Sequence, residues 1–107
     1  MRELQHASAQ GDNKEVRWLL GQGWPVDGKD LKDQFHAHEP AQMAATNGKT
    51  NTLRILKAHG ADFFSYTRTG MTLEELSDKH GHHECSKYIR KVKEEETIKE
   101  LMEEYSD

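Results

Sequence analysis

Pairs of glycine residues at a fixed spacing mark the first part of the chain. Gly11 and Gly23 are 12 positions apart, and so are Gly48 and Gly60. Glycine readily adopts the left-handed backbone conformation that ends helices, so each pair is predicted to bracket one short helix. The first interval holds the apolar residues Val16, Trp18, Leu19 and Leu20. In the second, Leu53, Leu56 and the neighbouring Ile55 give the helix an apolar face.

The stretch from His38 to Gly70 shows the complete unit. Pro40 suits the first position of a helix, where its missing N–H costs nothing. Asn47-Gly48 is a turn-forming pair that is expected to end this helix. Ala44-Ala45 are small enough to let a second helix approach closely. Two short antiparallel helices followed by a loop are therefore predicted. Such a unit is too small to bury its own apolar face, so it needs neighbours.

Equivalent residues recur before and after this unit. Ala7-Ser8 lie 37 positions before Ala44-Ala45, and Gly81 and Tyr88-Ile89 lie 33 positions after Gly48 and Ile55-Leu56. This register resembles the ankyrin repeat, a unit of about 33 residues with a β-turn, two helices and a Thr-Pro-Leu-His-x-Ala signature. The signature positions hold Glu39-Pro40-Ala41-Gln42-Met43-Ala44 and Thr72-Leu73-Glu74-Glu75-Leu76-Ser77.

The resemblance implies an all-α fold, an ankyrin-repeat solenoid of helix-turn-helix units with β-turn fingers. We expect a repeat domain over residues 1–92, with repeats at about 2–34, 38–70 and 71–92, and a charged amphipathic helix over 93–107. Residues expected in the core are Leu4, Ala7, Ser8, Trp18, Phe63 and Cys85. Trp18 is placed there because it replaces a family leucine.

Composition restricts the class of protein. A chain of 107 residues with 34% apolar and 32% charged residues fits one repeat domain, because each repeat contributes only a thin slice of core. The net charge of −4 and the dispersed basic residues argue against a nucleic-acid partner. No run of about 18 apolar residues and no signal peptide is visible, and there is a single cysteine. We therefore expect no membrane association and a cytoplasmic or nuclear location.

The first connection, residues 24–38, is four residues longer than the repeat period requires. Leu31 and Phe35 are its apolar residues, and they either fold back as local packing or are presented to a partner. A cluster of Asp33, His36, His38 and Glu39 has metal-ligand residue types, but no strict ligand spacing supports a site. A solvated loop is expected.

The second finger, residues 63–70, places Phe64, Tyr66 and Arg68 where the resemblance puts the tip, and aromatic and arginine residues suit recognition. Thr72 and Glu75 are predicted to form a capping box that opens the next helix. The later run from His80 to Cys85 also lacks zinc spacing. We expect His82 in the turn between helices.

Two apolar stripes follow each other in the last part of the chain: Cys85, Tyr88, Ile89 and Val92, then Ile98, Leu101, Met102 and Tyr105. In one continuous helix they would be rotated by more than about 120° from each other. Thr97 and Glu100 read as a capping box for a new helix. The chain therefore either breaks near Glu96 and folds back, or continues and offers its second stripe elsewhere. We expect residues 97–105 to be helical and to cover apolar surface, on the last repeat or on another chain, with the glutamates solvated.

No catalytic motif or cofactor signature is present, so neither an enzyme nor a cofactor or metal site is expected. The resemblance implies a non-catalytic protein-interaction module that binds a protein partner through its fingers and concave face. The candidate contact residues are Leu31, Phe35, His36, Met43, Phe64, Tyr66, Arg68, Leu101 and Tyr105. One alternative is a homo- or hetero-oligomeric assembly subunit that pairs through the C-terminal helix. A further alternative is a metal-binding protein that uses the histidines.

Overall fold

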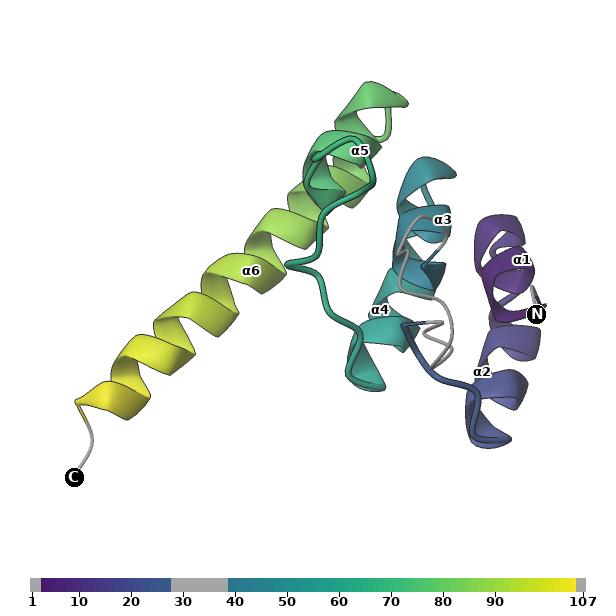
Figure 1. Cartoon of the computed structure of the whole chain (residues 1–107), viewed down its shortest axis with the longest axis horizontal. Helices are drawn as coiled ribbons and strands as arrows, with labels where there is room; N and C mark the ends of the chain where they lie inside the picture. Colours follow the sequence, from purple (N-terminus) through teal and green to yellow (C-terminus); the bar gives the residue numbers. More distant parts are fainter. Residues whose placement is uncertain (1–2, 28–38, 106–107) are drawn as a thin grey trace.

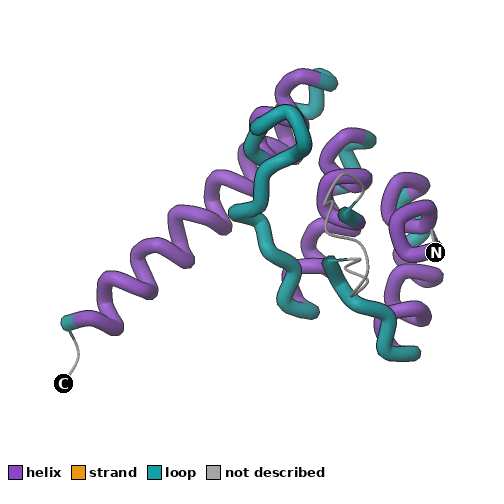
Figure 2. The backbone as a smooth tube through the Cα atoms, in the orientation of Figure 1, coloured by secondary structure: helices purple, strands orange, loops and turns teal. Residues whose placement is uncertain are grey.

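The computed structural model describes residues 3–27 and 39–105 of the 107-residue chain. Over these residues the chain is all-α, with helices and loops and no strand (Figure 2), which confirms the predicted fold class at that level. The helices are α1 (Glu3–Gln10), α2 (Asn13–Gly21), α3 (Pro40–Thr46), α4 (Thr50–Ala58), α5 (Leu73–Lys79) and α6 (His83–Glu104).

The helix ends lie where the local signals predict them. Pro40 opens α3, and the helix ends at Asn47 before Gly48, whose φ of +68° turns the chain. In that turn the N–H of Lys49 donates to the carbonyl of Ala44 at 2.8 Å. Thr72 and Glu75 form the predicted capping box at the start of α5. These signals act within a few residues, so the sequence alone carries them.

The helices form three hairpins that stack in two layers (Figure 1). In one layer α1 packs against α3 and α3 against α5; in the other, α2 packs against α4 and α4 against α6. Ala44 and Ala45 are fully buried, because α3 is the middle helix of its layer and small side chains let both neighbours approach. The hydroxyl of the buried Ser77 on α5 donates to the carbonyl of Ala45 at 3.3 Å. The core predicted around Leu4, Ala7, Ser8, Phe63 and Cys85 is confirmed.

The expected core position of Trp18 is wrong. Its side chain is 58% exposed, whereas Val16, Leu19 and Leu20 of the same helix are buried. At about 100° per residue, Trp18 points roughly 150° away from the centre of the face formed by those three residues. The face that packs on α1 and α4 therefore leaves Trp18 on the far side of α2.

One continuous helix, α6, runs through the position where a break was considered. Thr97 is an interior residue whose hydroxyl donates to the carbonyl of Lys93 at 2.9 Å, so the predicted cap at Thr97 is wrong. The first stripe packs on the body, with Cys85, Ile89 and Val92 buried. Residues 97–104 are helical as expected, but they extend past the other helices (Figure 1).

The second stripe does not cover the last repeat, so that one of the two expected contacts is wrong, and contact with another chain stays a prediction. Ile98, Leu101, Met102 and Tyr105 are 51%, 49%, 67% and 84% exposed. The uninterrupted helix turns this stripe away from the face that carries Ile89. Most glutamates of this segment are exposed to solvent, as expected. Glu96 is the exception, because it is half-buried and forms an ion pair with Lys57 of α4.

Candidate protein-interaction surfaces

The second finger, residues 63–70 between α4 and α5, which we call the finger, is held by hydrogen bonds at several points. The hydroxyl of Ser65 donates to Oε2 of the buried Glu39 at 2.9 Å. At the tip, the N–H of Thr67 donates to the carbonyl of Met71 at 2.8 Å, and the N–H of Met71 donates to Oγ1 of Thr67 at 3.0 Å. The finger therefore presents its side chains from a backbone that is fixed on both sides of the tip.

The finger and the first helices enclose a shallow groove, which we call the finger groove. It has a volume of about 310 Å³ and is lined by Gln42, Met43, Thr46, Thr67, Arg68, Thr69, Met71, Leu76 and Lys79. The structure thus brings together two residues that the sequence analysis proposed separately, Met43 on α3 and Arg68 on the finger. Tyr66 is 62% exposed, and its carbonyl lies 3.5 Å from Nε2 of Gln42, which places it next to this groove.

Phe64 belongs to a different surface. Phe63 and Phe64 form a bend in which Phe63 is buried while Phe64 is 43% exposed. The ammonium of Lys93 on α6 lies 5.1 Å from the centroid of the Phe64 ring and also bonds Glu74 at 2.9 Å. Phe64 therefore packs beside α6 and not among the residues of the finger groove.

The remaining predicted contact residues are not gathered at the finger groove. Leu101 lies on the part of α6 that extends away from the other helices, and Tyr105 directly follows its last residue (Figure 1). Leu31, Phe35 and His36 lie outside the residues that the structure describes, so both interpretations of the first connection stay open. The same holds for Asp33 and His38, on which that metal hypothesis depends.

The α5–α6 turn carries a compact charged network. Nδ1 of His83 lies 2.9 Å from Oδ1 of Asp78, and Nη2 of Arg90 lies 2.6 Å from Oδ2 of the same carboxylate. The hydrogen bond from His83, and after it the one from Arg90, lowers the pKa of Asp78 from 3.8 to about 2. Within residues 3–27 and 39–105, no group of three or more His, Cys, Asp or Glu side chains could hold a metal ion.

Cys85, near the start of α6, is a core residue. It is a free thiol that is only 1% exposed. Burial raises the pKa of its thiol, which keeps the group protonated and unreactive. The structure therefore gives Cys85 a packing role, as its position in the register predicted.

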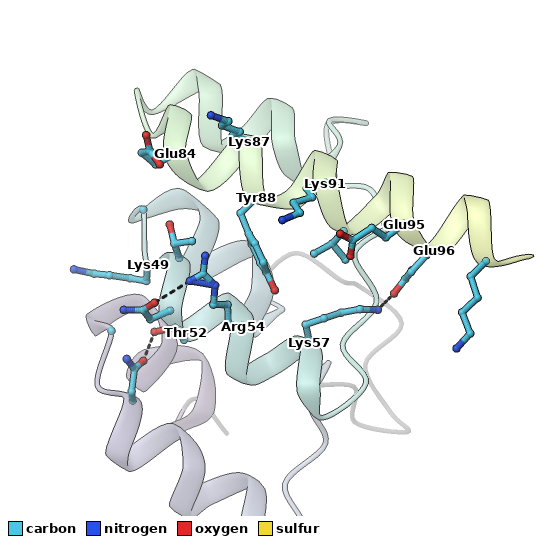
Figure 3. A pocket seen from close by; sticks show the side chains of 17 residues that line it. Lys49, Thr52, Arg54, Lys57, Glu84, Lys87, Tyr88, Lys91, Glu95 and Glu96 are labelled. Atoms are coloured by element: carbon cyan, nitrogen blue, oxygen red, sulfur yellow. Dashed lines mark hydrogen bonds and ion pairs between the residues drawn. The ribbon is translucent and has the colours of Figure 1, made fainter.

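A second and larger groove lies on the layer formed by α2, α4 and α6, where no motif of the sequence predicted a site. We call it the outer groove; its volume is about 1060 Å³ and its walls are α4, α6 and the turns before α2 and α4 (Figure 3). Basic residues that are dispersed in the sequence meet here, among them Lys49, Arg54, Lys87 and Lys91. In the sequence, the only local sign of this groove is the row of charged residues from Glu84 to Lys99. This row does not show which other helix packs against α6.

The part of the chain that the structure describes has no helix that combines the length and the apolar character needed to cross a membrane. Comparison with known families finds no family model that matches the chain. The chain is similar to Espin-like protein from Homo sapiens, with 32% identity over 74 residues. The matched region covers 69% of this chain but spans only 7% of the length of that relative.

Proposed function

We propose that the chain is a non-catalytic protein-interaction module, an ankyrin-type solenoid that binds a protein partner through its finger and concave face. Three helical hairpins in two layers, with turns in the 33-residue register of Gly48 and Gly81, support this assignment. The similarity to part of Espin-like protein is compatible with it. An intracellular location, cytoplasmic or nuclear, is part of the proposal, since the single cysteine is a buried free thiol.

One observation carries the proposal: Tyr66 is exposed beside the finger groove on a backbone that is already ordered. Tyrosine and arginine, together with tryptophan, are enriched among the residues that supply most of the binding energy at protein interfaces. A loop that is ordered before binding loses little conformational entropy when the partner arrives. Tyr66, Arg68 and Met43 are therefore the expected anchors, with Met43 half-buried in the lining of the groove.

The test compares proteins captured from cell lysate by the immobilised wild type and by Tyr66→Ala, with quantitative mass spectrometry as the readout. Trp18→Ala is the matched control, because it removes an equally exposed aromatic residue from α2, away from the finger. We expect a set of proteins that the wild type and the control retain and that the Tyr66 variant loses. Urea unfolding must show equal stability for the two variants. Retention of the same partners by Tyr66→Ala would place the binding surface elsewhere.

A second candidate function, an oligomeric assembly subunit, rests on the exposed stripe of α6. Four large apolar side chains at i, i+3, i+4 and i+7 face solvent on a helix that extends from the body. A helical stripe of this kind is the usual contact of paired helices. Light scattering on Leu101→Glu tests it: an oligomer that becomes a monomer supports assembly. A wild-type chain that stays monomeric throughout the accessible concentration range contradicts self-assembly.

A further inference from the structure

The outer groove concentrates positive charge on a chain that is acidic overall. Its basic side chains, listed here, outnumber its acidic ones six to three: Lys49, Arg54, Lys57, Lys87, Lys91 and Lys99 against Glu84, Glu95 and Glu96. The whole chain has a net charge of −4. A local surplus of positive charge attracts an anionic ligand to this one place while the rest of the surface repels it.

Several of these cations have no ion-pair partner among the residues that the structure describes. Lys57 forms an ion pair with Glu96 at the far end of the groove. Among the ion pairs of residues 3–27 and 39–105, none involves Lys49, Lys87 or Lys91. Lys87 and Lys91 are exposed and lie one turn apart on α6, so both ammonium groups can reach the same ligand.

Arg54 adds a cation that is held in place. Its guanidinium carbon lies 4.9 Å from the centroid of the Tyr88 ring, and Nη1 bonds Oδ1 of Asn51 at 3.3 Å. Figure 3 shows Arg54 and Tyr88 directed toward each other across the groove, from α4 and α6. Stacking on an aromatic ring orients a guanidinium while leaving donors available for a carboxylate. The site therefore combines one oriented donor group with two mobile ammonium groups.

The shape and the charge pattern of the outer groove fit a peptide. The α6 wall runs from Glu84 to Lys99, roughly 22 Å at the helical rise of 1.5 Å per residue, which is about the length of a seven-residue extended peptide. The charged residues of this wall follow one another as Glu84, Lys87, Lys91, Glu95, Glu96 and Lys99, so glutamates flank the two central lysines on both sides. Fixed carboxylates at these places repel the continuous charge of a nucleic-acid backbone, but they tolerate a chain whose acidic side chains are spaced.

We propose that the outer groove binds an acidic, extended peptide segment of a partner protein, with carboxylates contacting Arg54, Lys87 and Lys91. The groove lies on the layer of α2, α4 and α6, whereas the finger groove is formed by α3, α5 and the finger. The chain would thus hold two separate protein segments. This assignment is independent of the finger and of the stripe on α6, so either proposal can fail without the other.

The experiment measures fluorescence polarisation of a labelled octapeptide of alternating Glu and Ala, titrated with the full chain. Matched peptides carry Gln or Lys in place of Glu. The groove variant is Lys87→Glu/Lys91→Glu, and the charge-matched control is Lys14→Glu/Arg17→Glu on the exposed side of α2, outside the groove. We expect saturable binding of the Glu peptide, weakened at least about tenfold by the groove variant and much less by the control.

Three results would overturn the proposal. The first is equal binding of the Glu and Gln peptides, which would show that the groove does not recognise the negative charge of the peptide. The second is an equal effect of the two double variants, which would show that only net charge matters. The third is preferential binding of a labelled RNA dodecamer over the Glu peptide, which would make the groove a nucleic-acid site. Unfolding curves for both variants establish that each is folded, and Tyr66→Ala must bind the Glu peptide like the wild type.

Discussion

Substitution of Gly48 by alanine tests the packing of the second hairpin on the third. A Cβ added at Gly48 would lie 2.5 Å from Nδ1 and 2.7 Å from Cγ of His82, the residue that precedes α6. Gly11 occupies the equivalent turn of the first hairpin with nearly the same φ, +71° against +68°. A Cβ at Gly11 meets the side chain of Lys49 at 2.7 Å, and this long side chain can move aside.

The two substitutions share one cost and differ in the other. Alanine in the left-handed conformation costs about 1–2 kcal/mol at either position. At Gly48 the new methyl group must also displace the imidazole, and overpacking of this kind costs about 1–3 kcal/mol more. We therefore expect Gly11→Ala to lower the free energy of unfolding by about 1–2 kcal/mol and Gly48→Ala by roughly 2–5 kcal/mol.

Urea unfolding followed by circular dichroism measures both values, and a double-mutant cycle with His82→Ala isolates the clash. In the His82→Ala background, the cost of Gly48→Ala should fall to that of Gly11→Ala. Equal costs for the two glycine substitutions in the wild-type background, or a Gly48 cost that persists without the imidazole, would refute the predicted contact between the turn and His82.

Three further predictions follow from burial and charge. Leu56→Ala should lower the free energy of unfolding by about 2–5 kcal/mol, because Leu56 is fully buried. Trp18→Ala on the exposed side of α2 should change it by only about 0.5 kcal/mol. Equal effects of the two substitutions in urea unfolding would contradict the burial of Leu56 and the exposure of Trp18. The lowered pKa of Asp78 stabilises the fold above pH 3.8, and this stabilisation is lost as the pH falls toward about 2. Urea midpoints measured against pH should therefore fall less over this range for Asp78→Asn than for the wild type. Deletion of residues 97–107 should leave the free energy of unfolding within about 0.5 kcal/mol of the wild type, since residues 97–105 are exposed; a clear loss of stability would show that the end of α6 contacts the body.

The local signals of the sequence were sufficient for most helix boundaries. Pro40, the turn at Gly48 and the Thr72–Glu75 capping box all act on the backbone of their nearest neighbours, and each is found where it was predicted. The apolar residues of α2 and α4 likewise identified the core positions Val16, Leu19, Leu20, Leu53 and Leu56. A signal that is completed within one helical turn needs no information from the rest of the chain.

Local signals failed where a competing structure was available. Thr97 and Glu100 could cap a new helix, but continuing α6 adds one backbone hydrogen bond for each residue, and Thr97 bonds back to Lys93 instead. Trp18 was assigned by analogy to a position in the repeat, although its angle on α2 already pointed away from Val16 and Leu19. Periodicity was the better guide in this case, because it expresses the geometry of the helix itself.

The arrangement of the candidate sites was decided only by tertiary structure. Exposed aromatic and basic residues could be proposed from the sequence, but the division of Phe64 and Tyr66 between two surfaces follows from how the finger lies between α3 and α6. The outer groove exists because α4 packs against α6, which brings Arg54 to Tyr88 across 34 positions of sequence. Neighbouring residues determine where a helix begins and ends, whereas the charges that share a groove depend on which helices pack together.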